Sequence, residues 1–272
     1  MASCLSFYFA LTVLLATVVD ASNSISSTSD ENADISKSLV AWWKLDEKIG
    51  HLVADSSGNK ATGLVEQAGS QLAHTTDGIV FDGATYISMG TTPSLSGQTD
   101  FAVHAWVKVP PRIKQELCII QQRSDHIYGE WWLWIRNGSL WFTVYNDEFQ
   151  FRIEGTVPVT DGTWHHVAGV RNGTVGSIYV DSKLDKSQNG SKIVKLNSSL
   201  PVFIGYDPRD NKRYFHGELK EVQIFSAAVV PVGFNPISSY GIIVHSSTIQ
   251  QRWMDRMAAF NMRGSASPEF SS

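Results

Sequence analysis

The sequence predicts an all-β fold, a sandwich of two antiparallel sheets, for residues 39–228. Short apolar or alternating runs, separated by Gly, Asn, Asp and Ser, persist from Leu39 to Phe225. Such spacing is typical of all-β sandwiches rather than of βαβ units. In addition, Asn137-Gly138 lies between two alternating apolar runs. This is the strongest short signal for a β-hairpin, because both turn residues accept a positive φ.

Individual strands are expected where a short run alternates or is continuously apolar. The run Leu117-Cys118-Ile119-Ile120 is of the second kind, which is typical of a buried strand. In chain order, the expected strands are Val40–Leu45, Gly78–Phe81, Tyr86–Met89, Phe101–Val109, Leu117–Gln121, Trp131–Arg136, Leu140–Tyr145, Gln150–Ile153, His165–Arg171, Ser177–Val180, Val202–Ile204 and Gly217–Phe225.

The beginning of the chain has the features of a secretory signal peptide at residues 1–21. An apolar run from Phe7 ends at Val19, and the small residues Val19 and Ala21 fit cleavage after Ala21. The run is shorter than the ~20 apolar residues of a membrane-spanning helix. We therefore expect a secreted, extracellular protein without a membrane span.

Two further segments lie outside the predicted sandwich. Residues 22–38 are rich in Ser, Asp and Asn, so we expect a disordered leader. Residues 229–272 are expected to form an irregular C-terminal extension. Within it, apolar residues at helical spacing make 247–262 a candidate short helix.

Composition and sequons add expectations about partners, the thiol and surface glycans. The chain has 22 Lys and Arg against 26 Asp and Glu, so it lacks the basic excess of nucleic-acid-binding proteins, and we expect no nucleic acid partner. Once Cys4 leaves with the signal peptide, Cys118 is the only thiol. It is expected to be either a buried, inert thiol or a partner in an intermolecular disulfide. Four sequons predict surface glycans at Asn137, Asn172, Asn189 and Asn197.

The hairpin around Asn137-Gly138 contains the candidate ligand-binding residues. A two-residue turn pairs Arg136 with Ser139 and continues outward, and alternation assigns the pairs to two faces. One face is aliphatic and large, and is expected to be core. The other carries Trp132, Trp134, Arg136, Trp141 and Tyr145.

Two interpretations of this second face remain open. As an aromatic platform, it would stack on sugar rings, and its three Trp residues could be replaced by Ala without loss of stability. Alternatively, loops or the C-terminal extension cover the face and make it a second, minor core.

Several strings along the chain resemble laminin-G-like domains, which have the concanavalin A-like lectin/glucanase jelly-roll fold. These include Val40-Ala41-Trp42-Trp43-Lys44-Leu45, Phe101-Ala102-Val103-His104-Ala105-Trp106-Val107, Trp164-His165-His166-Val167-Ala168 and Gly217-Glu218-Leu219-Lys220-Glu221-Val222-Gln223-Ile224-Phe225. The resemblance covers about Leu39 to Phe225 and implies an extracellular binding module. It also implies a candidate structural calcium at Asp55 and Asn59, whereas the residue types themselves favour a simple tight turn there. Lys220, at the position of a second acidic ligand, would instead form an ion pair with Asp55.

An enzyme of this fold would need two carboxylates across a cleft. Glu218 and Glu221 are three residues apart, so regular alternation directs them to opposite faces, and no strand carries two acids on one face beside the Trp residues. The sequence therefore favours a non-catalytic, secreted glycoprotein that binds glycans or extracellular-matrix components. The alternatives are a structural extracellular or mineralising-matrix protein without glycan binding and, less favoured, a glycoside hydrolase.

Overall fold

The computed structural model describes residues 35–231 except 49, 67–72, 76, 112, 114, 124–128, 147–148, 191, 194, 197–198 and 210–212. The predicted signal peptide, all but the end of the leader, and the candidate helix at 247–262 lie outside the described residues. Within the described residues, no helix reaches the length and hydropathy that a membrane-spanning helix requires.

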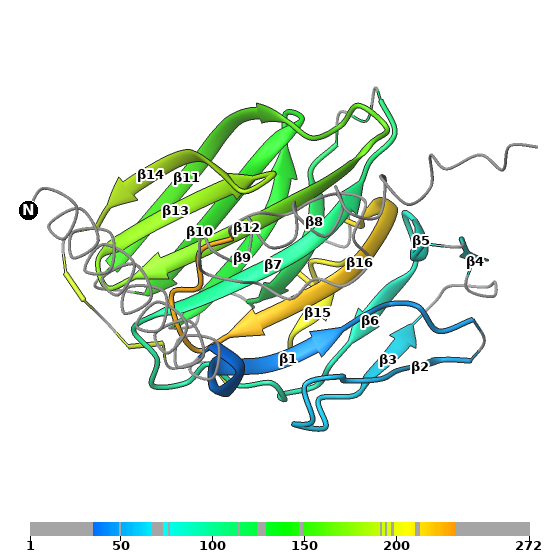
Figure 1. Ribbon diagram of the computed structural model, residues 1–272, viewed down its shortest axis with the longest axis horizontal. Coiled ribbons are helices and arrows are strands. Elements are labelled where there is room, and N and C mark those ends of the chain that lie inside the picture. Colours follow the sequence, from blue (N-terminus) through cyan, green and yellow to red (C-terminus); the bar gives the residue numbers. More distant parts are fainter. Residues whose placement is uncertain are drawn as a thin grey trace, which may run out of the picture. The chain divides into compact units, whose positions relative to one another are not determined.

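The described residues form two antiparallel sheets stacked as a sandwich (Figure 1). We call the first sheet A, in the order β14-β13-β12-β7-β16-β5-β4, with β1 also paired to β16. Its strands are β1 (Leu39–Trp43), β4 (Ala73–His74), β5 (Ile79–Asp82), β7 (Phe101–Lys108), β12 (Trp164–Asn172), β13 (Val175–Val180), β14 (Lys183–Asn189) and β16 (His216–Phe225).

The second sheet, sheet B, has the order β11-β10-β9-β8-β15-β6-β3-β2. Its strands are β2 (Leu52–Val53), β3 (Gly63–Glu66), β6 (Tyr86–Ser88), β8 (Leu117–Gln122), β9 (Glu130–Arg136), β10 (Ser139–Asn146), β11 (Phe149–Pro158) and β15 (Phe203–Ile204). In both sheets, neighbouring strands are often far apart in the sequence, which gives the sandwich its jelly-roll character.

Each expected strand is found in the structure, and the all-β prediction is confirmed. Four strands were not expected, namely β2, β3, β4 and β14. Three of these are only two to four residues long. β14 reads Lys-Leu-Asp-Lys-Ser-Gln-Asn and is largely exposed, so it lacks the apolar alternation on which strand prediction depends.

One prediction of side-chain direction is wrong. Glu218 and Glu221 do not face opposite sides of β16, because the register shifts between Lys220 and Gln223 and Glu221 has a φ of 52°. This β-bulge places an extra residue between Leu219 and Val222, which both lie in the core. Both glutamates therefore lie away from the core.

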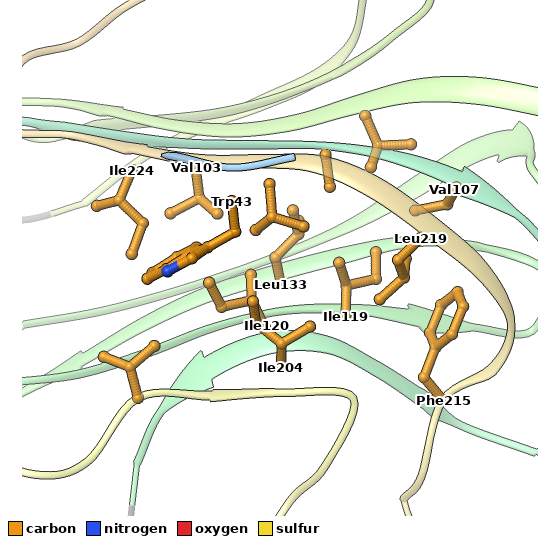
Figure 2. Packing of buried hydrophobic residues seen from close by; sticks show 14 of the residues in the cluster. Trp43, Val103, Val107, Ile119, Ile120, Leu133, Ile204, Phe215, Leu219 and Ile224 are labelled. Atoms are coloured by element: carbon orange, nitrogen blue, oxygen red, sulfur yellow. The ribbon is translucent and has the colours of Figure 1, made fainter. Parts of the chain in front are cut away.

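The core lies between the sheets. Trp43, Val103, Val107, Leu219 and Ile224 from sheet A point toward Ile119, Ile120, Leu133 and Ile204 from sheet B (Figure 2). Both Ile119 and Ile120 reach this core because the register of β8 shifts between Cys118 and Ile120. The Trp43 indole N–H, although buried, donates to the Ala61 carbonyl at 2.6 Å, so its burial leaves no unpaired donor.

The edges of the two sheets meet where β11 and β14 lie together. Asp185 of β14 accepts hydrogen bonds from the Thr156 backbone N–H at 2.9 Å, the Thr156 hydroxyl at 2.8 Å and the Val157 N–H at 3.2 Å. A single carboxylate thus joins two strands of different sheets. The contact also occupies edge N–H groups that would otherwise be open to pairing with another chain.

Candidate binding surface

The β9–β10 hairpin positions the predicted ligand-binding residues. Its register pairs Arg136 with Ser139, Trp134 with Trp141 and Glu130 with Tyr145, as the sequence predicts, and Asn137 has the required positive φ of 52°. The aliphatic face lies in the main core. Trp132, Trp134 and Trp141 form a separate cluster with Cys118 on the outer face of sheet B, and Tyr145 packs against it half-buried.

The three indole rings are almost fully enclosed. Trp132 is 4% exposed, Trp134 1% and Trp141 7%. Trp134 and Trp141 meet edge to face at a centroid distance of 5.6 Å, and Trp132 meets Trp141 in the same way at 6.4 Å. This geometry is favourable for aromatic quadrupoles. The rings are therefore a second, minor core, as one of the two interpretations expects, and are not an open platform.

A layer of arginine side chains covers these rings. The guanidinium carbon of Arg123 lies 3.9 Å from the ring centroid of Trp132, and that of Arg213 lies 4.9 Å from Trp134. Arg136 and Arg152 lie over Trp141 at 4.5 and 5.2 Å. These distances are those of cation–π contacts. We call Trp132, Trp134, Trp141 and these four arginines the arginine–tryptophan face.

Three carboxylates hold the arginine layer in place. Glu116 forms ion pairs with Arg136, at 3.1 Å, and with Arg213. Glu154 adds a contact to Arg136 at 3.3 Å, and the fully buried Asp207 lies 3.1 Å from Arg213. Guanidinium groups fixed by ring and carboxylate contacts present their remaining N–H donors in a set direction.

The arginine–tryptophan face has two features that suit a hydroxyl-rich ligand. The side chain of Arg136 is 36% exposed, and Arg152 is exposed. Beneath them, the indole N–H groups of Trp132 and Trp141 are buried and have no hydrogen-bond acceptor among the residues that the structure describes. Buried donors without acceptors are unfavourable, so an oxygen atom that reached them, from water or from a ligand, would stabilise the face.

Cys118 lies at the bottom of the same cluster. It is fully buried, and its thiol donates to the Tyr206 carbonyl at 3.2 Å. Burial, with a smaller contribution from the charge of Asp207, raises the pKa of this thiol well above its ordinary value. The structure therefore supports a buried, protonated thiol rather than a disulfide to another chain.

The residues of the predicted calcium turn do not fit a calcium ion. Partial burial raises the pKa of Asp55, but this is outweighed by hydrogen bonds from Trp42, Ser57 and Ala61, and the pKa lies below its ordinary value. Both carboxylate oxygens accept hydrogen bonds, at 2.8 to 3.0 Å. The amide of Asn59 donates to the Leu39 and Val40 carbonyls at 2.9 and 3.0 Å. N–H and hydroxyl donors thus occupy the oxygens that a calcium ion would need.

The expected ion pair between Lys220 and Asp55 is not formed. The ammonium nitrogen of Lys220 lies 4.3 Å from the ring centroid of Trp164 and 5.9 Å from that of Trp106. Across the ranges that the structure describes, no group of three or more His, Cys, Asp or Glu side chains is arranged to hold a metal.

One polar constellation was not expected. The Thr163 hydroxyl lies 3.2 Å from Nε2 of His165, and Nδ1 of His165 lies 2.8 Å from Asp181. This order resembles a nucleophile, base and acid. However, the Thr163 hydroxyl donates to Asp161 at 2.7 Å, so its proton points away from the imidazole. This constellation joins a loop to the β13–β14 turn. In the sequence, the only signal for it is a His with acids some way along the chain on either side.

Three of the four sequons lie on exposed side chains. Asn137, Asn172 and Asn189 are exposed at the ends of β9, β12 and β14. Asn197 lies outside the described residues. Asn137 directly follows Arg136 at the tip of the hairpin, so a glycan there would lie at the border of the arginine–tryptophan face.

Comparison with known proteins places the fold. The model of the family described as the concanavalin A-like lectin/glucanases superfamily matches residues 81–231. No curated protein sequence matches the chain.

Solved structures share the fold at low sequence identity. The binding domain of Paraclostridial Mosquitocidal Protein 1 matches with a TM-score of 0.58 and 15% identity, over 82% of this chain and 53% of that one. The receptor-binding domain of botulinum neurotoxin D matches with a TM-score of 0.53 and 14% identity, over 82% and 54%. This chain thus spans about half the length of these toxin domains. Domain 4 of an extracellular arabinanase from Geobacillus stearothermophilus, in complex with arabinotriose, matches with a TM-score of 0.53 and 21% identity, over 70% and 93%.

Proposed function

Because the chain belongs to the concanavalin A-like lectin/glucanase superfamily, we propose that it is a secreted, non-catalytic module that binds extracellular glycans through its arginine–tryptophan face. The observation that carries this proposal is the layer of fixed, partly exposed guanidinium groups above the indole N–H groups of Trp132 and Trp141, which have no acceptor among the described residues. Sugar hydroxyls both donate and accept, so they match N–H donors and the carboxylates beside them.

Several observations support the extracellular and non-catalytic parts of the proposal. The apolar run at residues 7–19 fits a signal peptide. Exposed Asn137, Asn172 and Asn189 are accessible for glycosylation. The carboxylates of the arginine–tryptophan face are engaged with arginines, and a hydrolase would need an acid and a base or nucleophile free to act on the scissile bond.

The similar structures bear on the type of ligand. One is a complex with arabinotriose, and another, a botulinum neurotoxin binding domain, is a complex with rat synaptotagmin II. A matrix protein is therefore the second candidate ligand. The same exposed arginines favour it, because Arg is enriched at the centres of protein interfaces.

The test is an array of neutral and acidic oligosaccharides together with immobilised extracellular-matrix proteins. The mature, secreted chain is compared with the double variant Arg136→Ala/Arg152→Ala. We expect selective binding to glycans, reduced at least about tenfold in the variant, because two charge-assisted donors are lost. Lys186→Ala removes an exposed cation from β14 and is the matched control.

The outcomes separate the candidates. Binding to matrix proteins alone, lost in the double variant, would assign the face to a protein ligand. A blank array with a folded protein would leave the structural, mineralising-matrix role. Glycan binding that the double variant keeps would place the site elsewhere on the molecule.

A further inference from the structure

A concave site lies on the opposite sheet, away from the arginine–tryptophan face. It is a pocket of about 440 Å³ where β5, the end of β7 and the start of β16 meet. This volume is within the range of small-ligand sites, roughly 300–1,000 Å³. None of the residues predicted from the sequence to bind ligand lies in it.

The walls of the pocket are partly apolar. Val80, Phe81, Pro110 and Pro111 line it, and the backbone of the 110–111 segment is held to the opposite loop because the Gly162 N–H donates to the Val109 carbonyl at 2.9 Å. At Gly217, which has a φ of 143°, an added Cβ would lie 2.4 Å from the Lys108 carbonyl. Only glycine therefore allows β16 to approach β7 so closely at this point.

The polar groups of the pocket are fixed by contacts of their own. Lys108 and Glu218 form an ion pair at 2.9 Å, and the second oxygen of Glu218 accepts from the Thr75 hydroxyl at 2.8 Å. One oxygen of Asp82 accepts from the N–H groups of Ala84 and Thr85 at 3.0 and 2.9 Å. Preorganised polar groups lower the entropy that is lost on binding.

The charges in the pocket indicate the class of ligand. Asp82 and Glu218 are acidic, Lys108 is basic, and His216 lies directly across from Asp82 in the strand register. A phosphate would meet two carboxylates, and an ammonium would meet Lys108 beside them, so an ion of neither sign finds a site of uniformly opposite charge. A neutral ligand with hydroxyl groups can donate to the carboxylates and accept from Lys108. Its C–H face can lie on the valine and proline walls.

We propose that this pocket binds a single neutral sugar ring, as a subsite separate from the arginine–tryptophan face. The inference rests on the proposed glycan-binding function and names a second place where it occurs. The pocket is open to solvent at the charged residues, with 37% of the Lys108 side chain exposed. A terminal or branching sugar of a longer chain can therefore enter it.

The experiment follows the imidazole resonances of His216 by NMR, with neutral methyl glycosides of glucose, galactose, mannose, arabinose and N-acetylglucosamine as probes. The variant His216→Gln assigns the resonance. We expect a saturable shift with at least one glycoside, at a Kd of about 1 mM, as for a small ligand with few contacts. Sodium phosphate and ethylamine at the same concentration and pH should give no saturable shift.

Three variants make the test specific. Val80→Trp fills the pocket from a half-buried position, and should weaken the glycoside-induced shift at least about tenfold. Leu184→Trp introduces the same ring at an exposed position on the opposite edge of sheet A, and should leave the shift unchanged. The double variant Lys108→Met/Glu218→Gln, which removes both charges together, should weaken binding without leaving either charge unpaired.

Failure of this inference differs from failure of the proposed function. No His216 shift with any glycoside, or a shift that Val80→Trp leaves intact, would overturn the pocket assignment. Array binding that depends on Arg136 and Arg152 would then still support the proposed function. A saturable shift produced by phosphate or ethylamine, but by no glycoside, would overturn the neutral-sugar assignment.

Discussion

At the residue scale, the tryptophans of the outer face of sheet B form the minor core that one of the two interpretations of the sequence expects. Their rings are buried like core residues, and they also support the guanidinium groups that reach solvent. The exposed part of this face is therefore arginine, and the tryptophans position it. Replacing one of these rings should therefore mainly lower the free energy of unfolding, and any loss of ligand binding should follow from that.

Trp134→Ala tests this order of effects. Trp134 is 1% exposed and contacts Trp132, Trp141 and two arginines. We expect a loss of about 3–5 kcal/mol in the free energy of unfolding, measured by urea denaturation. Arg152→Ala, which removes an exposed side chain from the same face, should change stability by less than about 0.5 kcal/mol. Equal, small effects of both variants would contradict the burial of this ring.

His104 gives the fold a dependence on pH. It is fully buried on the outer side of sheet A, where Nε2 lies 2.9 Å from the Val229 carbonyl and the ring lies 5.3 Å from His166. Burial lowers the pKa of His104 from 6.5 to about 4, against a smaller opposing effect of the Val229 hydrogen bond. Burial and the nearby His104 also lower the pKa of His166.

Stability should therefore fall with acidification. The folded chain takes up a proton at His104 less readily than the unfolded chain does. The contribution of His104 to the free energy of unfolding is therefore complete above pH 6.5, and it is lost as the pH falls toward 4. The shift corresponds to roughly 3 kcal/mol for this group. Urea midpoints between pH 7 and 4 measure it, and His104→Gln should flatten the curve. An unchanged slope in that variant would show that other groups cause the acid sensitivity.

At the element scale, the two sheets are joined at one edge by a side chain. Asp185 accepts three hydrogen bonds from Thr156 and Val157 of β11, whereas β14 itself is exposed and polar. The attachment of β14 to the sandwich thus depends on this carboxylate as well as on its pairing with β13. The carboxylate also occupies backbone N–H groups at the end of β11 that would otherwise be open to pairing with another chain.

Asp185→Ala should release this edge locally. We expect a loss of about 1–2 kcal/mol, since two backbone donors and a hydroxyl lose a charged acceptor. Hydrogen exchange at the amides of Thr156 and Val157 should accelerate in the variant. Asp185→Asn keeps one acceptor oxygen and should have a smaller effect. Unchanged hydrogen exchange at both amides would contradict the role of Asp185 in attaching β14 to β11.

The turn after β2, which contains Asp55, is a second element with a testable property. Because three N–H groups and the Ser57 hydroxyl already occupy the oxygens of Asp55, neither calcium nor a chelator should alter stability. We expect melting temperatures in 2 mM calcium and in EGTA to agree within about 1 °C. Asp55→Ala, in contrast, should lower the melting temperature by several degrees, roughly the effect of losing 1–2 kcal/mol. A calcium-dependent rise would restore the metal site.

At the scale of the whole molecule, the distance between the sheets is set by pairs of small and large residues. Gly169 of β12 lies against Phe142 of β10, and Gly176 of β13 lies against Phe151 of β11. A Cβ added at Gly169 would be 2.7 Å from the Phe142 ring. The buried rings occupy the space that the glycines leave.

Gly169→Val should therefore destabilise the sandwich by about 1–3 kcal/mol or more through overpacking. Phe142→Leu in the same chain should restore part of this loss, because it makes room for the added methyl groups. A double-mutant cycle from urea denaturation measures the coupling. Additive losses would show that the two residues do not share one space.

The sequence by itself determined the fold class, the β9–β10 register and the two faces of that hairpin. Each rests on a local signal: alternation with a period of two, and a turn that only a few residue types accept. Tertiary structure alone decided what covers the outer face. The arginines that do so come from β9, β11 and two loops, at positions 123, 136, 152 and 213, and no local pattern relates them.

The same reason explains the bulge at Glu221, the loss of the predicted Lys220–Asp55 pair and the pocket beside β5. Each depends on strands that are distant in the sequence but adjacent in a sheet, such as β5 and β16. Local residue patterns report which face of a strand is buried. Which side chains then meet across strands is fixed by topology and packing, and these exist only in the folded chain.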